Sequence, residues 1–297
     1  ESAPVRFEGP DAILRLAQRL ASMAGRRLDE ASPFVDARLA DGTRLHAVIP
    51  PISSGSPLIS LRIPHRGGFN LEDLIGLGTV DHRGARWLSA IVDARLAFLV
   101  SGGTGSGKTT LLATLLEVVD PAQRILLVED SAELRPRHPH VVRLEARPAN
   151  LEGAGQVTLR DLVRQALRMR PDRVVVGEVR GAEVVDLLAA MNTGHEGGCG
   201  TVHANSPGDV PARLEALGLM AGLPRGAVHA LVCAGVHVVI HLQRSPRAVS
   251  EVHVVRPSRG VATTVPALVR RGDRLIGAEA EPLLAQLLKN AGTEPPA

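Results

Sequence analysis

The sequence predicts an α/β core preceded by a smaller α+β domain, and three groups of residues predict it. Two short apolar runs, 124–129 (RILLVE) and 173–177 (RVVVG), have the length and continuity of strands buried inside a sheet. A third run, 96–100 (LAFLV), leads into a glycine-rich loop and then into a helix-forming run without glycine. Near the start of the chain, Asp41-Gly42 separates two strand-like segments and predicts a β-hairpin.

Length and composition exclude several classes of protein. The 297 residues, 44% of them apolar, provide cores for one large or two ordinary domains and argue against disorder. The apolar runs, such as 96–100, are far shorter than the roughly 20 residues that a membrane-spanning helix needs. Cys199 and Cys233 form no disulfide framework and match no metal-ligand spacing, which favours the reducing cytoplasm. The opening residues show neither a signal-peptide pattern nor an initiating Met, so we expect the chain to begin inside a longer protein.

The basic residues are almost all arginine, because only Lys108 and Lys289 are lysines among the 34 basic residues. A GC-rich genome would explain this bias, since alanine, glycine and valine are abundant too. Arginine also matches the geometry of phosphate oxygens, so contact with phosphate or nucleic acid is the alternative interpretation. Aromatic residues make up 2% of the chain and tyrosine is absent, which leaves little for stacking on single-stranded nucleic acid.

The glycine-rich loop at 102–109 (GGTGSGKT) fits the P-loop pattern completely and lies between a predicted strand and a predicted helix. In such a loop the backbone N–H groups point at phosphate oxygens, and the positive end of the helix dipole faces the same oxygens. Lys108 would reach the β- and γ-phosphates, and the Thr109 hydroxyl would bind Mg²⁺. We therefore expect the chain to bind a nucleoside triphosphate through Gly103, Thr104, Gly105, Ser106, Gly107, Lys108, Thr109 and Thr110.

Acidic residues follow both buried strands downstream of the P-loop. Glu129 and Asp130 end the first strand, with Glu133 close behind, and Glu178 ends the second. Ligands of α/β proteins bind at the carboxyl ends of the strands, so these acids are expected to lie near the nucleotide. Each acid alone could be a solvated strand cap. Beside a P-loop, they predict contacts with magnesium-bound water or with the water that attacks the phosphate.

Two histidines, His195 and His203, flank a glycine-rich loop that leads into a short strand. Together with Cys199 they could suggest a zinc site, but no fourth ligand lies nearby in the sequence. A lone histidine is usually structural. His203, however, is expected to end a strand beside the P-loop, where a side chain can sense the γ-phosphate.

Four segments, in their order along the chain, resemble those of the type II/type IV secretion ATPase superfamily. They are the P-loop, 125–134 (ILLVEDSAEL), 167–181 (LRMRPDRVVVGEVRG) and 194–206 (GHEGGCGTVHANS), and they correspond to the Walker A, Asp, Walker B and His boxes. The residues of these segments are most similar to those of the tight-adherence (Flp) pilus branch, including conjugal-transfer-associated members. Residues 33–45 and 58–62 resemble the N-terminal domain of that branch, so the resemblance runs from about residue 10 to residue 256.

This resemblance implies a RecA-like P-loop NTPase core that hydrolyses ATP with Mg²⁺, and it implies roles for the matching residues. Lys108 and Thr109 hold phosphates and Mg²⁺, and Glu178 is the Walker B acid that helps to bind the metal, partly through water. Glu133 is the general base for the attacking water, and His203 reads the γ-phosphate. The arginines placed near the nucleotide, within a subunit or across an interface, are Arg164, Arg168 and Arg180, and those of the N-terminal domain that close over it are Arg44 and Arg62.

One segment departs from the pattern of the family. Gly198-Cys199-Gly200 stands where a serine and larger residues are common. We expect these small residues to loosen the loop of the His box and to affect when His203 engages the nucleotide.

The predicted organisation has three parts. Residues 1–66 form the α+β N-terminal domain, truncated at its start, residues 67–80 a linker and hinge containing Gly67-Gly68, and residues 81–297 the RecA-like ATPase domain. The expected elements of the first domain are a helix at 10–24 and strands at 35–40, 43–49 and 58–63. Those of the second, besides the strands above, are helices at 83–93, 158–169, 207–219, 225–234 and 282–289, and an antiparallel pair at 236–242 and 249–256.

The resemblance implies a hexameric motor whose Mg²⁺-dependent ATP hydrolysis powers type IV (Flp/Tad-like) pilus assembly or type II/IV secretion. Its partners would be further copies of the chain and an inner-membrane platform protein, without direct contact with nucleic acid. Its place would be the cytoplasm, at the inner face of the cell membrane. A DNA-transfer or nucleic-acid motor with the same core is the alternative, and a P-loop kinase or other transferase is disfavoured by the Asp and His boxes.

Overall fold

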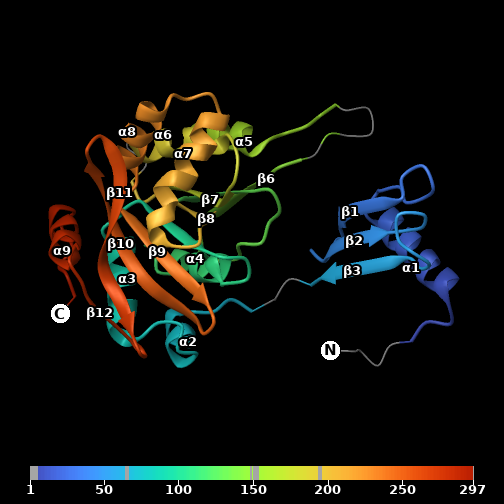
Figure 1. Ribbon diagram of the computed structural model, residues 1–297, viewed down its shortest axis with the longest axis horizontal. Helices are drawn as coiled ribbons and strands as arrows, with labels where there is room; N and C mark the ends of the chain where they lie inside the picture. Colours follow the sequence, from blue (N-terminus) through green and yellow to red (C-terminus); the bar gives the residue numbers. More distant parts are fainter. Residues whose placement is uncertain (1–5, 64–66, 148, 150–153, 193–195, 297) are drawn as a thin grey trace. The chain divides into compact units, whose positions relative to one another are not determined.

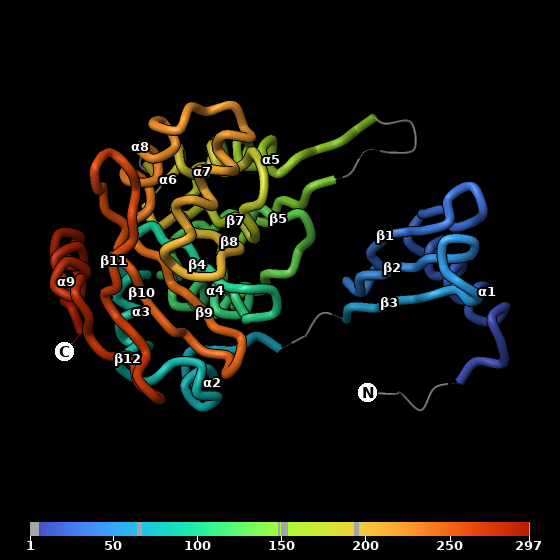
Figure 2. Tube along the Cα trace, viewed as in Figure 1, coloured from blue at the N-terminus to red at the C-terminus, as the bar shows by residue number. Residues whose placement is uncertain are grey.

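The computed structural model describes residues 6–63, 67–147, 149, 154–192 and 196–296, and it divides into two compact units (Figures 1 and 2). The first unit ends at Gly67 and the second begins at Gly68. Hydrophobic side chains form one core in the smaller unit and two in the larger unit.

The smaller unit packs helix α1 (Pro10–Met23) on a three-stranded antiparallel sheet. Its strands follow the order β1 (Phe34–Arg38), β2 (Arg44–Val48) and β3 (Leu58–Arg62). The predicted helix and the three predicted strands are all present. Fully buried alanines on α1 allow the helix to lie close to the sheet, and they share a core with side chains of β1 and β2; these residues are Ala17, Ala21, Val35, Leu45 and Ala47.

The hairpin predicted at Asp41-Gly42 joins β1 to β2. Gly42 has a φ of 89°, a left-handed conformation that glycine adopts without steric cost. The carboxylate of Asp41 accepts hydrogen bonds from the backbone N–H and the hydroxyl of Thr43, at 2.9 and 3.0 Å. This turn sets the register of the hairpin, in which Arg38 pairs with Arg44.

The larger unit is built on a sheet in the order β12-β11-β10-β9-β4-β8-β7-β5-β6. Along this order the neighbours from β9 to β6 are parallel and those from β12 to β9 are antiparallel. The α/β core and the antiparallel pair β9–β10 are therefore confirmed, whereas β6 at one edge and β11 and β12 at the other extend the sheet beyond the prediction. The strands are β4 (Phe98–Gly102), β5 (Ile125–Glu129), β6 (Val141–Glu145), β7 (Arg173–Val179), β8 (Cys199–His203), β9 (Val238–Arg244), β10 (Arg247–Ser258), β11 (Val261–Arg271) and β12 (Arg274–Gly277).

Helices cover both faces of this sheet. One core includes side chains of α3 (His82–Asp93), α4 (Lys108–Glu117) and α9 (Glu281–Asn290). The opposite core includes those of α5 (Leu159–Leu167), α6 (Glu183–Asn192), α7 (Val210–Met220) and α8 (Arg225–Gly235), where a short helix, η1 (Pro207–Asp209), precedes α7. Successive strand residues supply alternate faces: Phe98 and Val100 enter the first core and Leu99 the second. Burial on both faces explains why the central strands are continuously apolar.

The segment predicted to be a linker contains helix α2 (Leu71–Gly76). Asn70 and Asp73 form a capping box that begins this helix. Phe69 packs against the core, and its carbonyl accepts a hydrogen bond of 2.6 Å from the hydroxyl of Thr114 on α4. The described residues from Gly68 onward are thus part of the larger unit.

Candidate nucleotide-binding and catalytic site

Four adjacent strands bring the motif residues to one edge of the sheet. The order β4-β8-β7-β5 is parallel throughout, so the carboxyl ends of these strands lie at the same edge. The P-loop follows β4, His203 ends β8, Glu178 lies near the end of β7, and Glu129 ends β5. The sheet therefore gathers residues from four distant segments of the chain, and Gly102 and His203 are direct partners in the β4–β8 ladder.

The P-loop turns tightly between β4 and α4. Gly102 has a φ of 150°, and a Cβ atom there would lie 2.5 Å from the carbonyl oxygen of Leu242. Gly107 caps α4 with a φ of 99°, and a Cβ atom there would lie 3.2 Å from the Cδ atom of Arg247. Gly102 is thus required by conformation and by space and Gly107 by its left-handed conformation, as the P-loop pattern predicts. The first turn of α4, with Thr109 and Thr110, presents backbone N–H groups to this loop.

The side chain of Lys108 is buried against the loop, and the residue is only 7% exposed. Its Nζ atom donates hydrogen bonds to the carbonyls of Gly102 (3.0 Å) and Gly103 (2.9 Å). Burial lowers the pKa of Lys108, and the nearby carboxylate of Glu178 opposes that shift. The ammonium group is therefore held at the loop that the sequence predicts to bind phosphate.

Glu178 and His203 are in contact. The Nε2 atom of His203 lies 3.1 Å from Oε1 of Glu178, and its Nδ1 atom lies 3.5 Å from Nζ of Lys108. Burial and the charge of Lys108 lower the pKa of His203, although the carboxylate of Glu178 opposes this shift, so the neutral form of the ring is favoured. The tautomer with a proton on Nε2 fits both neighbours, because Nε2–H can donate to the carboxylate while Nδ1 faces the ammonium group.

An irregularity in strand pairing orients Glu178. The β7–β8 register shifts between Val176 and Val179, where three steps along β7 match two along β8. Such bulges change the direction in which a side chain points. The hydroxyl of Thr201 donates a hydrogen bond of 2.6 Å to the carbonyl of Gly177 inside this bulge.

The small residues before His203 have a packing reason. Cys199 is fully buried. A Cβ atom on Gly200 would lie 2.8 Å from the carbonyl oxygen of Val176, and one on Gly198 would lie 3.0 Å from Cγ of Met191. The described part of this segment therefore packs closely against β7 and α6, which is a different consequence from the looser loop that we expected. His195 lies outside the described residues, and among those described no group of three or more His, Cys, Asp or Glu residues could hold a metal ion.

Glu129 fixes the segment that contains Glu133. Glu129 is 4% exposed, and its Oε1 atom accepts hydrogen bonds from the backbone N–H groups of Glu133 and Leu134, both at 2.9 Å. Burial raises the pKa of the Glu129 carboxyl to about 7, although both backbone hydrogen bonds oppose the shift. Sequence patterns indicated Glu129 only as an acid at the end of a strand. Its contact with the Glu133 backbone depends on a loop conformation that those patterns do not specify.

The predicted arginines lie in several places. Arg180 forms an ion pair with Asp130, which directly follows β5. The Nε atom of Arg164 on α5 is 2.7 Å from Oδ1 of Asp186 on α6, and Arg168 is an exposed residue at the end of α5. The structure therefore brings Arg180 next to the Asp box and directs Arg164 toward α6.

Arg44 and Arg62 lie in the smaller unit, where they pair across β2 and β3. Arg38 pairs with Arg44 across β1 and β2, so three arginines form one cross-strand row. Residues paired in this way lie on the same face of a sheet. Arg38 was not predicted to belong with Arg44 and Arg62, although the register of a hairpin around Asp41-Gly42 indicates its pairing with Arg44.

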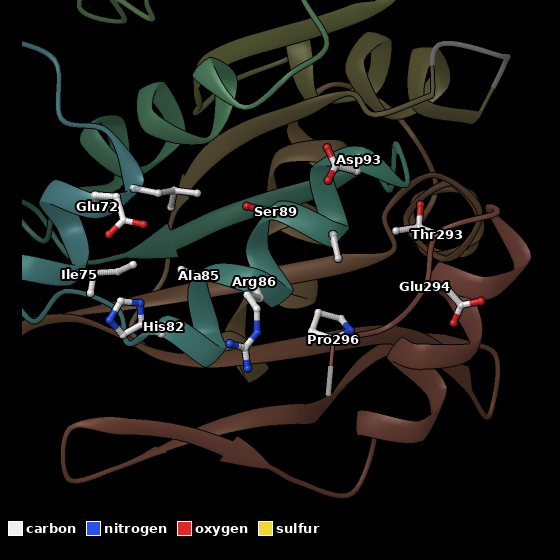
Figure 3. A pocket seen from close by; sticks show the side chains of 12 residues that line it. Glu72, Ile75, His82, Ala85, Arg86, Ser89, Asp93, Thr293, Glu294 and Pro296 are labelled. Carbon is white, nitrogen blue, oxygen red and sulfur yellow. The ribbon is translucent and has the colours of Figure 1, made fainter.

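A separate cavity of about 500 Å³ lies between α2, α3 and the end of the chain (Figure 3). His82, Arg86 and Asp93 line it on α3, and Thr293 and Glu294 line it from the C-terminal segment. None of the predicted site residues lines this cavity. Among the described residues, no helix combines the length and apolar character that crossing a membrane requires.

Three solved structures have similar folds. The VirB11 ATPase of the Brucella suis type IV secretion system, in complex with sulphate, is 26% identical and matches 82% of this chain and 83% of its own, with a TM-score of 0.50. The Legionella pneumophila ATPase DotB is 19% identical over 98% of this chain and 88% of its own, with a TM-score of 0.54. The pilus retraction motor PilT with bound ADP is 22% identical over 86% of this chain and 66% of its own, with a TM-score of 0.52.

Relatives with more similar sequences are also proteins of secretion or conjugal transfer systems. A Mycobacterium tuberculosis protein named for conjugal transfer is 57% identical over 265 residues, which are 86% of this chain and 75% of the relative. The type IV secretion system protein PtlH of Bordetella pertussis is 33% identical over 262 residues, 79% of this chain and 77% of its own. The family described as type II/IV secretion system protein matches residues 1–267.

The P-loop at the carboxyl edge of a RecA-like sheet defines the class of this protein as a P-loop nucleoside triphosphatase. The chain belongs to the type II/IV secretion system protein family. The resemblance inferred from the four boxes and the predicted fold class are both confirmed.

Proposed function

We propose that this protein is an ATP-hydrolysing motor that powers assembly of a tight-adherence (Flp) type of pilus or secretion by a related machine. The observation that carries the proposal is the contact between Lys108, His203 and Glu178 at the sheet edge beside the P-loop. A lysine that can bind phosphate, an acid that can bind Mg²⁺ and a histidine that can read a phosphate lie within one group of side chains.

In this mechanism the P-loop N–H groups and Lys108 bind the β- and γ-phosphates of ATP. Thr109 and Glu178 supply hard oxygen donors of the kind that Mg²⁺ prefers, so the residues present fit this ion. Bound there, Mg²⁺ would neutralise charge that develops on the phosphate oxygens. Glu133 takes the proton of the attacking water, and the carboxylate of Glu129 holds the backbone next to it.

His203 would read the γ-phosphate by exchanging one hydrogen bond for another. A neutral imidazole has one N–H group, and the tautomer inferred above directs it at Glu178. Donating to a phosphate oxygen would therefore release Glu178 at the same time. Arg164 would similarly have to leave Asp186 in order to reach a nucleotide, whereas Arg180 is close to the Asp box without such a change.

We further propose that the motor is a ring of identical subunits, with six as the number that the family resemblance implies. The row of Arg38, Arg44 and Arg62 lies in the unit that ends at Gly67, and the P-loop lies in the other. An arginine that completes a P-loop site can come from a neighbouring subunit or from a domain that closes over it. Residues 67–80 would contain the hinge for that closure, and the motor would work in the cytoplasm against an inner-membrane platform protein.

A DNA-transfer motor is the second candidate, since relatives of this chain are named for conjugal transfer. The two proposals are distinguished by ATP hydrolysis measured with Mg²⁺, with single-stranded DNA, and with vesicles that carry the membrane platform of the same machine. Stimulation by the vesicles alone supports the pilus or secretion motor, and stimulation by DNA alone supports the second candidate. Absence of Mg²⁺-dependent hydrolysis under all conditions would contradict both. The mass of the particle with and without nucleotide tests the ring.

A further inference from the structure

The buried carboxylate of Glu129 contacts two parts of the site, the segment that contains Glu133 and the strand β7 that carries Glu178. As the last residue of β5 it is almost completely covered, and one of its oxygens accepts two backbone hydrogen bonds from the segment that contains Glu133. Leu134, the second donor, is fully buried in the hydrophobic core. The Glu129 carboxylate thus holds the backbone of this segment, and the apolar side chain of Leu134 packs it against the core.

The same carboxylate side chain lies against β7, one residue before Glu178. A Cβ atom on Gly177 would lie 2.8 Å from Cγ and 3.2 Å from Oε1 of Glu129. Gly177 is not one of the glycines with a positive φ, so its backbone would accept other residues. Space for Glu129 is therefore the reason that the structure shows for a glycine at this position.

We propose that Glu129 is a positioning residue for ATP hydrolysis, which sets the place of Glu133 relative to the strand end that carries Glu178. The inference rests on the proposed function, because it takes Glu133 as the base for the attacking water. Glu129 accepts a hydrogen bond from the backbone of Glu133 and lies against Gly177, the strand neighbour of Glu178, so its side chain links the segments that carry the two acids. A shift of about 1 Å in such a group can reduce the rate on the order of a hundredfold.

The chemistry of this contact depends on an acceptor oxygen and not on a charge. Burial disfavours the ionised form, as the raised pKa of Glu129 records. A glutamine at the same position has an amide oxygen that can accept the same two N–H bonds. A side chain without that oxygen leaves the N–H groups of Glu133 and Leu134 without their acceptor, and because Leu134 is buried this disturbs the segment.

The test compares Glu129→Ala with Glu129→Gln in a chain that contains both units. Glu145→Ala is a matched control, because Glu145 ends the neighbouring strand β6 in register with Glu129 and is exposed. Three quantities are measured: kcat and KM for ATP, the affinity for a non-hydrolysable ATP analogue with Mg²⁺, and amide hydrogen exchange of residues 130–134 without nucleotide. If Glu129→Ala does not fold, Gly177→Ala replaces it, since the added methyl group displaces the carboxylate from the other side.

For Glu129→Ala we expect kcat to fall about tenfold or more, with KM and analogue affinity within about threefold, and exchange at Glu133 and Leu134 to accelerate. Glu129→Gln and Glu145→Ala should keep most of the wild-type kcat and exchange rates. Wild-type kcat in Glu129→Ala would overturn the inference. Equal loss in Glu129→Gln and Glu129→Ala with unchanged exchange would overturn it too, because Glu129 would then act through its charge. Either result leaves the proposed function intact as long as Lys108→Ala abolishes hydrolysis.

Discussion

The imidazole of His203 lies 3.1 Å from the carboxylate of Glu178, and the second ring nitrogen lies 3.5 Å from the ammonium group of Lys108. Three motifs that are widely separated in the sequence thus meet in one chain of contacts. Because burial and Lys108 lower the pKa of His203, the neutral form of the ring is favoured between the carboxylate and the cation. A phosphate that binds Lys108 would therefore compete with Glu178 for the hydrogen bond of His203.

Replacing Lys108 by alanine should abolish ATP turnover. Lys108 is the one P-loop lysine, and its ammonium group is held by the loop carbonyls at 2.9 to 3.0 Å. Phosphate release is measured at saturating ATP and Mg²⁺. Lys289→Ala is the matched control, since the chain's other lysine is exposed on α9 and should keep full activity. Substantial turnover by folded Lys108→Ala protein would refute the assignment of the nucleotide site.

Replacing Glu133 or Glu178 by glutamine should stop hydrolysis and keep ATP bound. Withdrawing a proton from water and stabilising developing charge act mainly in the transition state, so kcat falls while nucleotide affinity changes little. Removal of a general base typically costs on the order of a hundredfold or more in rate. Equilibrium binding and single-turnover hydrolysis separate the two effects. Normal turnover by Glu133→Gln would transfer the role of base to Glu178.

The stability of the protein should depend on pH through Glu129. Its pKa is about 7 in the folded protein against a reference value of 4.5, so below pH 4.5 the carboxyl is protonated in both states. Between these values the unfolded chain releases a proton that the folded protein keeps, and stability falls as pH rises. Above about pH 7 the decrease in the free energy of unfolding is constant, on the order of 3 kcal/mol.

Glu129→Gln lacks this titration, so its stability relative to wild type should increase between about pH 4.5 and pH 7. Denaturant midpoints of both proteins, measured at half-unit steps of pH, give the comparison. Parallel curves for the two proteins would show that Glu129 has the same pKa folded and unfolded.

Mixing two inactive proteins should restore activity if Arg62 acts across an interface. In rings assembled from Lys108→Ala and Arg62→Ala subunits, some sites combine an intact P-loop with an intact arginine from the neighbour. Lys108→Ala mixed with Glu178→Gln is the control, because both changes affect the same group of side chains and no site is complete. Mixed rings that are as inactive as their components would place Arg62 in its own subunit's site or outside any site.

The sequence predicted the parts of this site for which residue type and position along a strand are sufficient. The P-loop, with positive φ at Gly102, Gly105 and Gly107, and the apolar strands that end in acids are of this kind. The pairing of Arg164 with Asp186 could not be predicted, because helical spacing shows which face a residue occupies but not which helix packs there. Strand β11 was missed because its residues, including Thr263, Thr264 and Pro266, form no alternating or continuous apolar pattern.

The close approach of Gly177 to Glu129 also limits how relatives of this protein can differ from it. A lineage that gained a larger residue at 177 would need a shorter one at 129, and the backbone around Glu133 would then require a new acceptor. We expect substitutions at these two positions to arise together in evolution, although the residues lie on separate strands. Covariation between them would follow from the packing of one carboxyl side chain into the space that a side chain at position 177 would otherwise occupy.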